Sequence, residues 1–117
     1  LIVETSSVST AYALSAGGPI CSPDAKVLII EPIAPHNLNV RPLVVPESTD
    51  ISITISSRDD EAVLTMDNRN FTIRPDAEVK VSVAQFSLKR VRLPKSSFVK
   101  ALRSKLFWGE DIRNNDD

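Results

Sequence analysis

Glycine, cysteine and histidine are scarce in this sequence, and their scarcity excludes several kinds of site. Of 117 residues, 3 are glycine, where a usage of about 7% would give roughly 8. Two of the three are adjacent and the third stands far from them, so no G-x-G-x-x-G or G-x-x-x-x-G-K-[ST] motif is present. A self-contained Rossmann or P-loop site is therefore excluded. One cysteine and one histidine leave no internal disulfide and no Cys/His zinc site, which favours a reducing, cytoplasmic setting.

Neither sign of charge dominates, and no apolar run is long. The 14 Lys and Arg side chains nearly balance the 15 Asp and Glu side chains, and the formal net charge is -1. Because proteins that bind nucleic acid or anionic membranes by charge carry a basic excess, neither partner is expected. Every apolar run is far shorter than the ~20 residues that span a membrane, and no signal peptide opens the chain. The length fits one domain, residues 1–117, with a real core.

Strand patterns fill most of the chain instead. Residues 27–30 form a continuous aliphatic run that is typical of a strand buried on both faces. In residues 51–55, three isoleucines alternate with polar residues and so share one face of a strand. Six or seven strands at this spacing predict a mainly β fold, either a sandwich or an open barrel-like sheet. The further strands are expected at residues 1–5, 62–66, 71–73, 79–83 and, after a change of register, 86–93.

The connections between these strands have their own signals. Residues 67–70 form a turn at which Asn68 can take a positive φ. The stretch after the second strand is rich in proline, which predicts an irregular crossover or an edge strand because proline cannot donate to a ladder. Its prolines are Pro32, Pro35, Pro42 and Pro46.

Two short helices are expected near the ends of the chain. Residues 10–16 can form a helix that Gly17-Gly18-Pro19 would end. Ser97 is a suitable N-cap for a C-terminal helix, with Gly109 as its stop. The apolar residues of that helix share one stripe: Phe98, Val99, Leu102 and Leu106. At the other end, an abrupt start on three large aliphatic residues implies that more sequence precedes Leu1 in a parent protein.

Four polar groups offer chemistry, and each also has a simpler structural interpretation. His36 sits in a proline-stiffened loop, where it either points at a ligand or caps a backbone carbonyl. Residues 59–61, Asp-Asp-Glu, either hold a divalent cation or form a solvated hairpin tip. Residues 89–92, Lys-Arg-Val-Arg, either clamp a phosphate or form an exposed strand face. Cys21 has no base nearby in the sequence and is most simply a small buried hydrophobe.

The segment from Ser9 to Ile20 is the strongest candidate for a ligand contact. It combines a hydroxyl-rich turn, a helix start, the only tyrosine of the chain and a Gly-Gly-Pro stop. The free N–H groups of a helix start suit phosphate or ribose oxygens. Tyr12 adds a ring for stacking and a hydroxyl for hydrogen bonding. On these grounds alone, a nucleotide contact and simple helix packing both stay open.

The same segment closely resembles a signature of the NAD kinase family. Residues 9–20 read STAYALSAGGPI, against the family's S-T-A-Y-x-L-S-A-G-G-P-I. Residues 34–43 resemble the family's P-H-x-L-x-x-R-P stretch, and residues 66–69 stand where a D-G-Q-like turn is usual. The resemblance covers nearly the whole chain. It implies a β-sandwich that follows an N-terminal α/β kinase domain, with NAD bound between the two and the C-terminal helix packed back on the first.

The resemblance also implies which residues bind the dinucleotide. Thr10, Ala11, Tyr12 and Ser15 would contact NAD, and His36 would lie near the phosphate or ribose of the acceptor. No catalytic or metal-ligating residue is expected here, since the family's G-G-D-G and N-E motifs are missing from the sequence. The implied reaction converts NAD to NADP at the 2′-hydroxyl of the adenosine ribose. Its phosphoryl donor, ATP or polyphosphate, and its Mg²⁺ would belong to the whole enzyme, which forms homodimers or tetramers.

The loop before Ser9 departs from the family. Residues 5–12 read TSSVSTAY where the family reads T-P-T-G-S-T-A-Y. A β-branched Val8 in place of glycine removes the positive-φ option and blocks a close backbone approach to a ligand. The alternative is therefore a non-catalytic sandwich that serves in assembly, or a degenerate fragment of the enzyme. A lipid-kinase relative shares the two-domain plan, but the match at residues 9–20 weighs against it.

Overall fold

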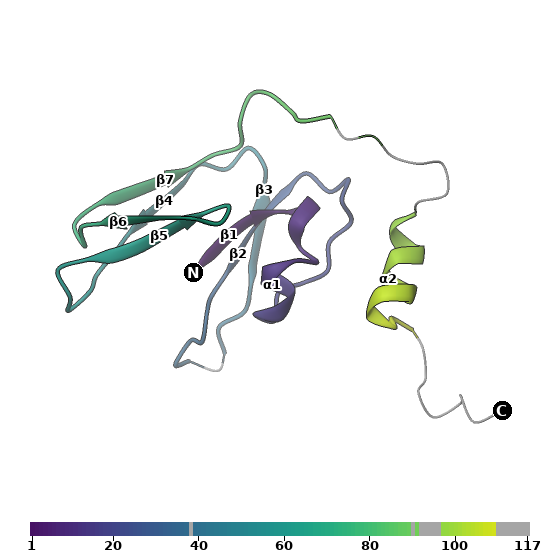
Figure 1. The fold of residues 1–117 in the computed structure, drawn as a ribbon, viewed down its shortest axis with the longest axis horizontal. Helices are drawn as coiled ribbons and strands as arrows, with labels where there is room; N and C mark the ends of the chain where they lie inside the picture. The colour runs from purple at the N-terminus through teal and green to yellow at the C-terminus, as the bar shows by residue number, and fades with distance from the viewer. Residues whose placement is uncertain (38, 90, 92–96, 110–117) are drawn as a thin grey trace.

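The computed structural model describes residues 1–37, 39–89, 91 and 97–109 (Figure 1). Strands predominate, with one short helix near the N-terminus and one C-terminal helix, so the prediction of a mainly β, sandwich-type fold is confirmed. In chain order the elements are β1 (Ile2–Thr5), the 3-10 helix η1 (Ser6–Val8), α1 (Tyr12–Ser15), β2 (Val27–Glu31), β3 (Leu43–Pro46), β4 (Ile51–Thr54), β5 (Ala62–Met66), β6 (Arg69–Ile73), β7 (Glu78–Val81) and α2 (Phe98–Leu106).

The centre of the molecule is a three-stranded antiparallel sheet in the order β1-β2-β3. Its middle strand, β2, is the predicted doubly buried strand, and Ile29 is fully enclosed. Because β3 lies at the edge of this sheet, it tolerates Pro46, which stands opposite Val27. For the proline-rich stretch the sequence predicted either an irregular crossover or an edge strand, and the stretch ends in the edge strand β3. α1 lies against this sheet (Figure 1).

Two antiparallel strand pairs, β4–β7 and β5–β6, complete the β structure. In the first pair, Ile51, Ile53 and Ile55 are half-buried while their neighbours are exposed, which confirms the shared face. In the second pair the turn is shorter than expected. Asp67 and Asn68 both have positive φ, 43° and 68°, and Arg69 already pairs with Met66. The turn is therefore a two-residue hairpin turn, whose twist suits the flanking strands better than a four-residue loop.

The predicted strand at residues 86–93 is wrong for the part that the structure describes. Residues 82–89 and 91 are not strand, and Phe86, Leu88 and Val91 are largely exposed. Alternating apolar residues form a stable strand only where a neighbouring strand and a covering layer are available. Arg90, Arg92 and Leu93 lie outside the described residues.

α2 begins where expected and ends earlier. The Ser97 hydroxyl accepts a hydrogen bond from the N–H of Lys100 at 3.1 Å, so Ser97 is the N-cap. Phe107, with φ 52°, takes the left-handed C-terminal position that was predicted for Gly109. Its N–H donates to the carbonyl of Arg103 at 3.1 Å, which closes the helix before Gly109 is reached. Leu102 is the buried member of the predicted stripe, whereas Val99 and Leu106 are exposed.

None of the helices described here is long and apolar enough to cross a membrane.

Candidate functional site

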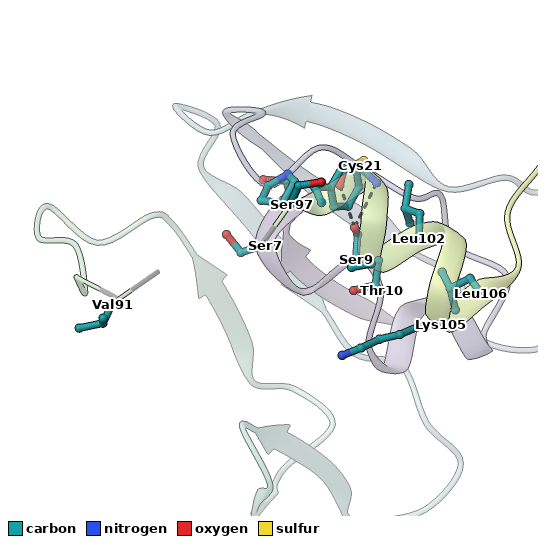
Figure 2. Close-up of a pocket in the computed structure, with 13 residues that line it drawn as sticks. Ser7, Ser9, Thr10, Cys21, Val91, Ser97, Leu102, Lys105 and Leu106 are labelled. Atoms are coloured by element: carbon teal, nitrogen blue, oxygen red, sulfur yellow. Dashed lines mark hydrogen bonds between the residues drawn. The ribbon is translucent and has the colours of Figure 1, made fainter. Parts of the chain in front are cut away.

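The hydroxyl-rich turn after β1 is tied to the returning chain at two points. The buried Ser6 hydroxyl donates to the carbonyl of Ala25 at 2.6 Å. The Ser9 hydroxyl, with 1% of its residue surface exposed, accepts from the N–H of Cys21 at 3.1 Å and donates to the carbonyl of Cys21 at 3.4 Å (Figure 2). These two serines bond part-buried backbone groups and fix residues 6–10 against residues 21–25. No sequence signal separates them from exposed Ser7.

Replacing Ser9 by alanine should destabilise the protein by about 1–2 kcal/mol, because the buried N–H of Cys21 loses its partner. The matched control is Ser7→Ala, since Ser7 is exposed in the same turn. Urea unfolding of the three proteins measures the effect. Equal unfolding midpoints for Ser9→Ala and Ser7→Ala would show that the two hydrogen bonds do not hold the turn.

The predicted helix at 10–16 is a single turn, α1, whose inner residue Ala13 is fully buried. Its end is the predicted glycine stop. Gly17 has φ 95°, and the N–H of Gly18 donates to the carbonyl of Ala13 at 2.8 Å. A Cβ on Gly18 would lie 2.9 Å from that carbonyl oxygen, so only glycine fits without a shift. One helical turn has too few aligned peptide dipoles to attract an anion strongly, and the predicted phosphate seat at a helix start is not supported.

The outer side of this turn carries the predicted dinucleotide contacts. Thr10, Ala11, Tyr12 and Ser15 are all exposed. Tyr12 leaves 67% of its surface open. Tyr12 and Ser15 are three residues apart on one helical turn and therefore neighbours on its surface. The exposed residues Thr10, Ala11, Tyr12 and Ser15 are called the α1 surface below, and they lie beside the buried Ser9 and Ala13.

His36 is also exposed, in the loop that joins β2 to β3. Within the described part of the chain it makes no hydrogen bond. The interpretation of His36 as a residue that caps a backbone carbonyl is therefore unsupported. Its ring is free to meet a ligand, although no hydrogen bond links it to the α1 surface.

A cavity of about 630 Å³ lies between this turn and α2 (Figure 2). Its volume is typical of small-molecule sites. Thr10 and Lys105 both line it, whereas Ala11, Tyr12 and Ser15 do not. Its full lining is Ser6, Ser7, Ser9, Thr10, Cys21, Pro23, Val91, Ser97, Phe98, Ala101, Leu102, Lys105 and Leu106. Cys21, expected to be buried, is half-buried at this cavity because Ser9 holds its backbone and leaves one side open.

The other polar groups differ from their simpler interpretations. Asp59, Asp60 and Glu61 are exposed as expected, but they lie in the connection between β4 and β5, which do not pair with each other, so the predicted hairpin tip is wrong. The described residues contain no group of three Asp, Glu, His or Cys side chains placed to hold a metal ion. Lys89 and Val91 are exposed but outside any strand, so the strand-face interpretation of residues 89–92 is wrong for these two.

Two glutamates, Glu4 on β1 and Glu31 on β2, each place a buried carboxyl oxygen in the structure and were not predicted from the sequence. Glu31 is 2% exposed, and its Oε2 has no hydrogen-bond partner. Oε1 of Glu4 is likewise buried and unpartnered. Burial, and secondarily the neighbouring charge of Glu31, raises the pKa of Glu4 above its usual value. The only sequence signal was an acidic residue at the end of the aliphatic run of β2.

Comparison with known proteins places this chain within a named family. The family model for the ATP-NAD kinase C-terminal domain matches residues 1–93 of this chain. The chain is 45% identical over 114 residues to the NAD kinase of Flavobacterium johnsoniae and 47% identical to that of Christiangramia forsetii. Each alignment covers 97% of this chain and 39% of the relative. The chain therefore spans about two-fifths of the length of these relatives.

The fold is also similar to a solved structure. That structure is the crystal structure of yeast NADH kinase complexed with NADH, with a TM-score of 0.73 and 23% sequence identity. The similarity covers 96% of this chain and 36% of the yeast chain. At this identity the likeness establishes the fold.

Proposed function

The chain belongs to the family of ATP-NAD kinase C-terminal domains, and from that membership we propose that its α1 surface binds NAD for phosphorylation to NADP. The observation that carries the proposal is the exposure of Thr10, Tyr12 and Ser15 together on a turn that buried hydrogen bonds hold rigid. A surface that is ordered before binding loses less entropy when the ligand arrives. The NADH bound to the structurally similar yeast enzyme supports a nicotinamide dinucleotide as the ligand.

Each residue of the α1 surface has a distinct part in this proposal. The hydroxyls of Thr10 and Ser15 donate to or accept from the ribose and phosphate oxygens. Ala11, with no side chain beyond Cβ, lets the ligand approach the backbone. The exposed ring of Tyr12 stacks on a base or sugar while its hydroxyl makes a hydrogen bond. His36 is proposed to reach the same ligand from its own loop.

Phosphoryl transfer requires more than this surface supplies. The acceptor hydroxyl must be aligned with the donor, a metal ion must offset the developing charge, and a base must take the proton. The described residues contain no group of three or more His, Cys, Asp or Glu side chains that could hold a metal ion. We assign to this chain the positioning of NAD alone. Holding ATP or polyphosphate and its metal is proposed for the remaining part of the enzyme.

The purified 117-residue chain should show no kinase activity. With ATP, NAD and Mg²⁺, a coupled assay for NADPH should stay at background, because the chain positions the acceptor and lacks the donor site. A full-length relative such as the enzyme of Flavobacterium johnsoniae serves as the positive control. Turnover of the isolated chain clearly above background would overturn this division of labour.

Assembly is the second candidate function, and one surface favours it. The face of the β5–β6 hairpin that carries Met66 and Phe71 is partly exposed, and neither strand pairs with another in the described part of the chain. Partly open apolar faces and free strand edges invite a partner. A pure assembly module would elute as an oligomer on size exclusion and give no heat with NAD, which separates it from the first proposal.

A further inference from the structure

The two buried carboxylates form a single structural unit beneath α1. In the β1–β2 register, Glu4 stands opposite Ile29 and Ile2 opposite Glu31. Glu4 and Glu31 therefore lie on the same face of the sheet, diagonally across the two strands. Diagonal neighbours have Cα atoms about 7–8 Å apart, within reach of two glutamate side chains.

We propose that Glu4 holds a proton that it donates in a hydrogen bond to Glu31 beneath α1, and that the two act together as positioning residues that make the α1 surface sensitive to pH. This inference rests on the proposed binding of NAD at that surface. The geometry that supports it is a pair of carboxyl oxygens, Oε1 of Glu4 and Oε2 of Glu31, which are buried and without a partner. A proton on one carboxyl turns it into a donor for the other, so both oxygens gain a hydrogen bond.

Among the described residues, no positively charged group on the elements around Glu4 and Glu31 neutralises their charge in place of that proton. Among the described residues, neither Glu4 nor Glu31 forms an ion pair, and the N-terminal amino group of Leu1 pairs with neither of them. The only titratable group of α1 is the exposed phenol of Tyr12, and β3 has none. In the connection from α1 to β2, Asp24 is exposed and Lys26 pairs with Glu47 at 3.9 Å. Two adjacent carboxylates without a cation cannot both ionise cheaply in a buried setting.

Glu31 packs against the end of α1 at Gly18, and this contact connects the pair to α1. A Cβ at Gly18 would lie 3.2 Å from Oε2 of Glu31 and 2.9 Å from the carbonyl oxygen of Ala13. The carboxyl of Glu31 is therefore packed against the turn that ends α1. When both carboxylates are charged, they repel each other and are more stable in water, and both effects weaken the packing of Glu31 against this turn. Because α1 is one turn long, a shift of its end also moves Tyr12 and Ser15.

The direction of the pH effect follows from the raised pKa of Glu4. The folded state binds the proton more tightly than the unfolded chain does, so the contribution to stability is complete at low pH. It is lost as pH rises through the folded-state pKa. NAD binding should weaken over the same interval, because the α1 surface loses its support.

The test compares the full 117-residue chain with its Glu31→Gln variant. Glutamine has the shape of protonated glutamate and donates to Glu4 at every pH. When the pH is raised from about 4, near the ordinary pKa of glutamate, to about 8, the Kd of the wild type for NAD should rise several-fold and its urea midpoint should fall. Both should stay nearly constant in Glu31→Gln. Glu47→Gln, which alters an exposed ion pair, is the matched control and should follow the wild type.

The outcomes separate this inference from the proposed function. Parallel pH profiles of stability in the wild type and Glu31→Gln would overturn the proton-sharing pair. If added Mg²⁺ alone restored the wild-type urea midpoint and NAD affinity at high pH, a bound cation would replace the shared proton, and the inference would also be wrong. A chain that binds no NAD at any pH, but whose stability loses its pH dependence in Glu31→Gln, would refute the proposed function and retain the pair.

Discussion

Replacing Tyr12 by alanine should raise the KM for NAD by about tenfold in a full-length enzyme containing this domain, which corresponds to about 1.4 kcal/mol of lost binding. The KM for the phosphoryl donor should change by less than about twofold, because the proposed donor site lies outside this chain. The ring of Tyr12 is 67% exposed, and its hydroxyl makes no hydrogen bond within the described part of the chain. Its removal should therefore leave the fold intact. Steady-state kinetics with each substrate varied in turn measures the effect.

Two further variants isolate what Tyr12 contributes. Tyr12→Phe keeps the ring and removes the hydroxyl, so its KM for NAD should fall between those of the wild type and the alanine variant. Phe107→Ala removes another exposed aromatic ring, at the end of α2, which belongs neither to the α1 surface nor to the lining of the cavity, and should leave both KM values unchanged. Equal increases in the KM for NAD and for the donor after Tyr12→Ala would indicate that Tyr12 serves the fold and not the ligand.

Gly18→Val should have the largest effect on stability, a loss of about 3 kcal/mol. The first carbon of the new side chain would meet the backbone oxygen of Ala13 at 2.9 Å and Oε2 of Glu31 at 3.2 Å. The backbone cannot rotate away as a flexible side chain would, so α1 must lift from the sheet. For a domain of this size the loss corresponds to a fall in Tm of roughly 10–20 °C. Thermal unfolding and NAD titration should both report it.

The neighbouring glycine provides the control for this substitution. Gly17 has φ 95°, but a Cβ there would meet nothing within 4 Å. Gly17→Asn, a residue that tolerates left-handed backbone, should cost about 1 kcal/mol or less. If both variants lost the same stability, the close approach of Gly18 to Ala13 would not be what fixes α1.

Local patterns were sufficient where the alternation of apolar and polar residues is regular, even for β4, whose partner strand β7 lies beyond β5 and β6 in the sequence. The isoleucines of β4 and the β5–β6 hairpin could be predicted because alternation and the turn residue Asn68 are read directly from the chain. Phe86 and Leu88 also alternate with polar residues, yet they are not in a strand, because sequence alone does not show whether a neighbouring strand is present. The residue at which α2 ends could not be predicted from the local sequence either. Phe107 accepts a left-handed conformation that glycine adopts more easily.

The candidate site, like the fold, could be predicted from the sequence only in part. The family resemblance implied Thr10, Tyr12 and Ser15 as ligand contacts, which stay a prediction; all three are exposed, and Tyr12 and Ser15 lie on the single turn of α1. The residues that hold this turn were not predicted as such. Ser9 differs from Ser7 only through its contact with Cys21, twelve positions away. Glu4 and Glu31 are diagonal neighbours because of the strand register, which brings together residues 27 positions apart, and the acidic residue at the end of the aliphatic run of β2 does not by itself show this.

Calorimetric titration of the full 117-residue chain with NAD tests the central claim most directly. The account predicts a saturable heat of binding for the wild type, about tenfold weaker binding for Tyr12→Ala, and an unchanged affinity for Phe107→Ala. No heat from a wild-type chain that unfolds cooperatively, or equal affinities of the wild type and Tyr12→Ala, would contradict the claim that the α1 surface binds the dinucleotide.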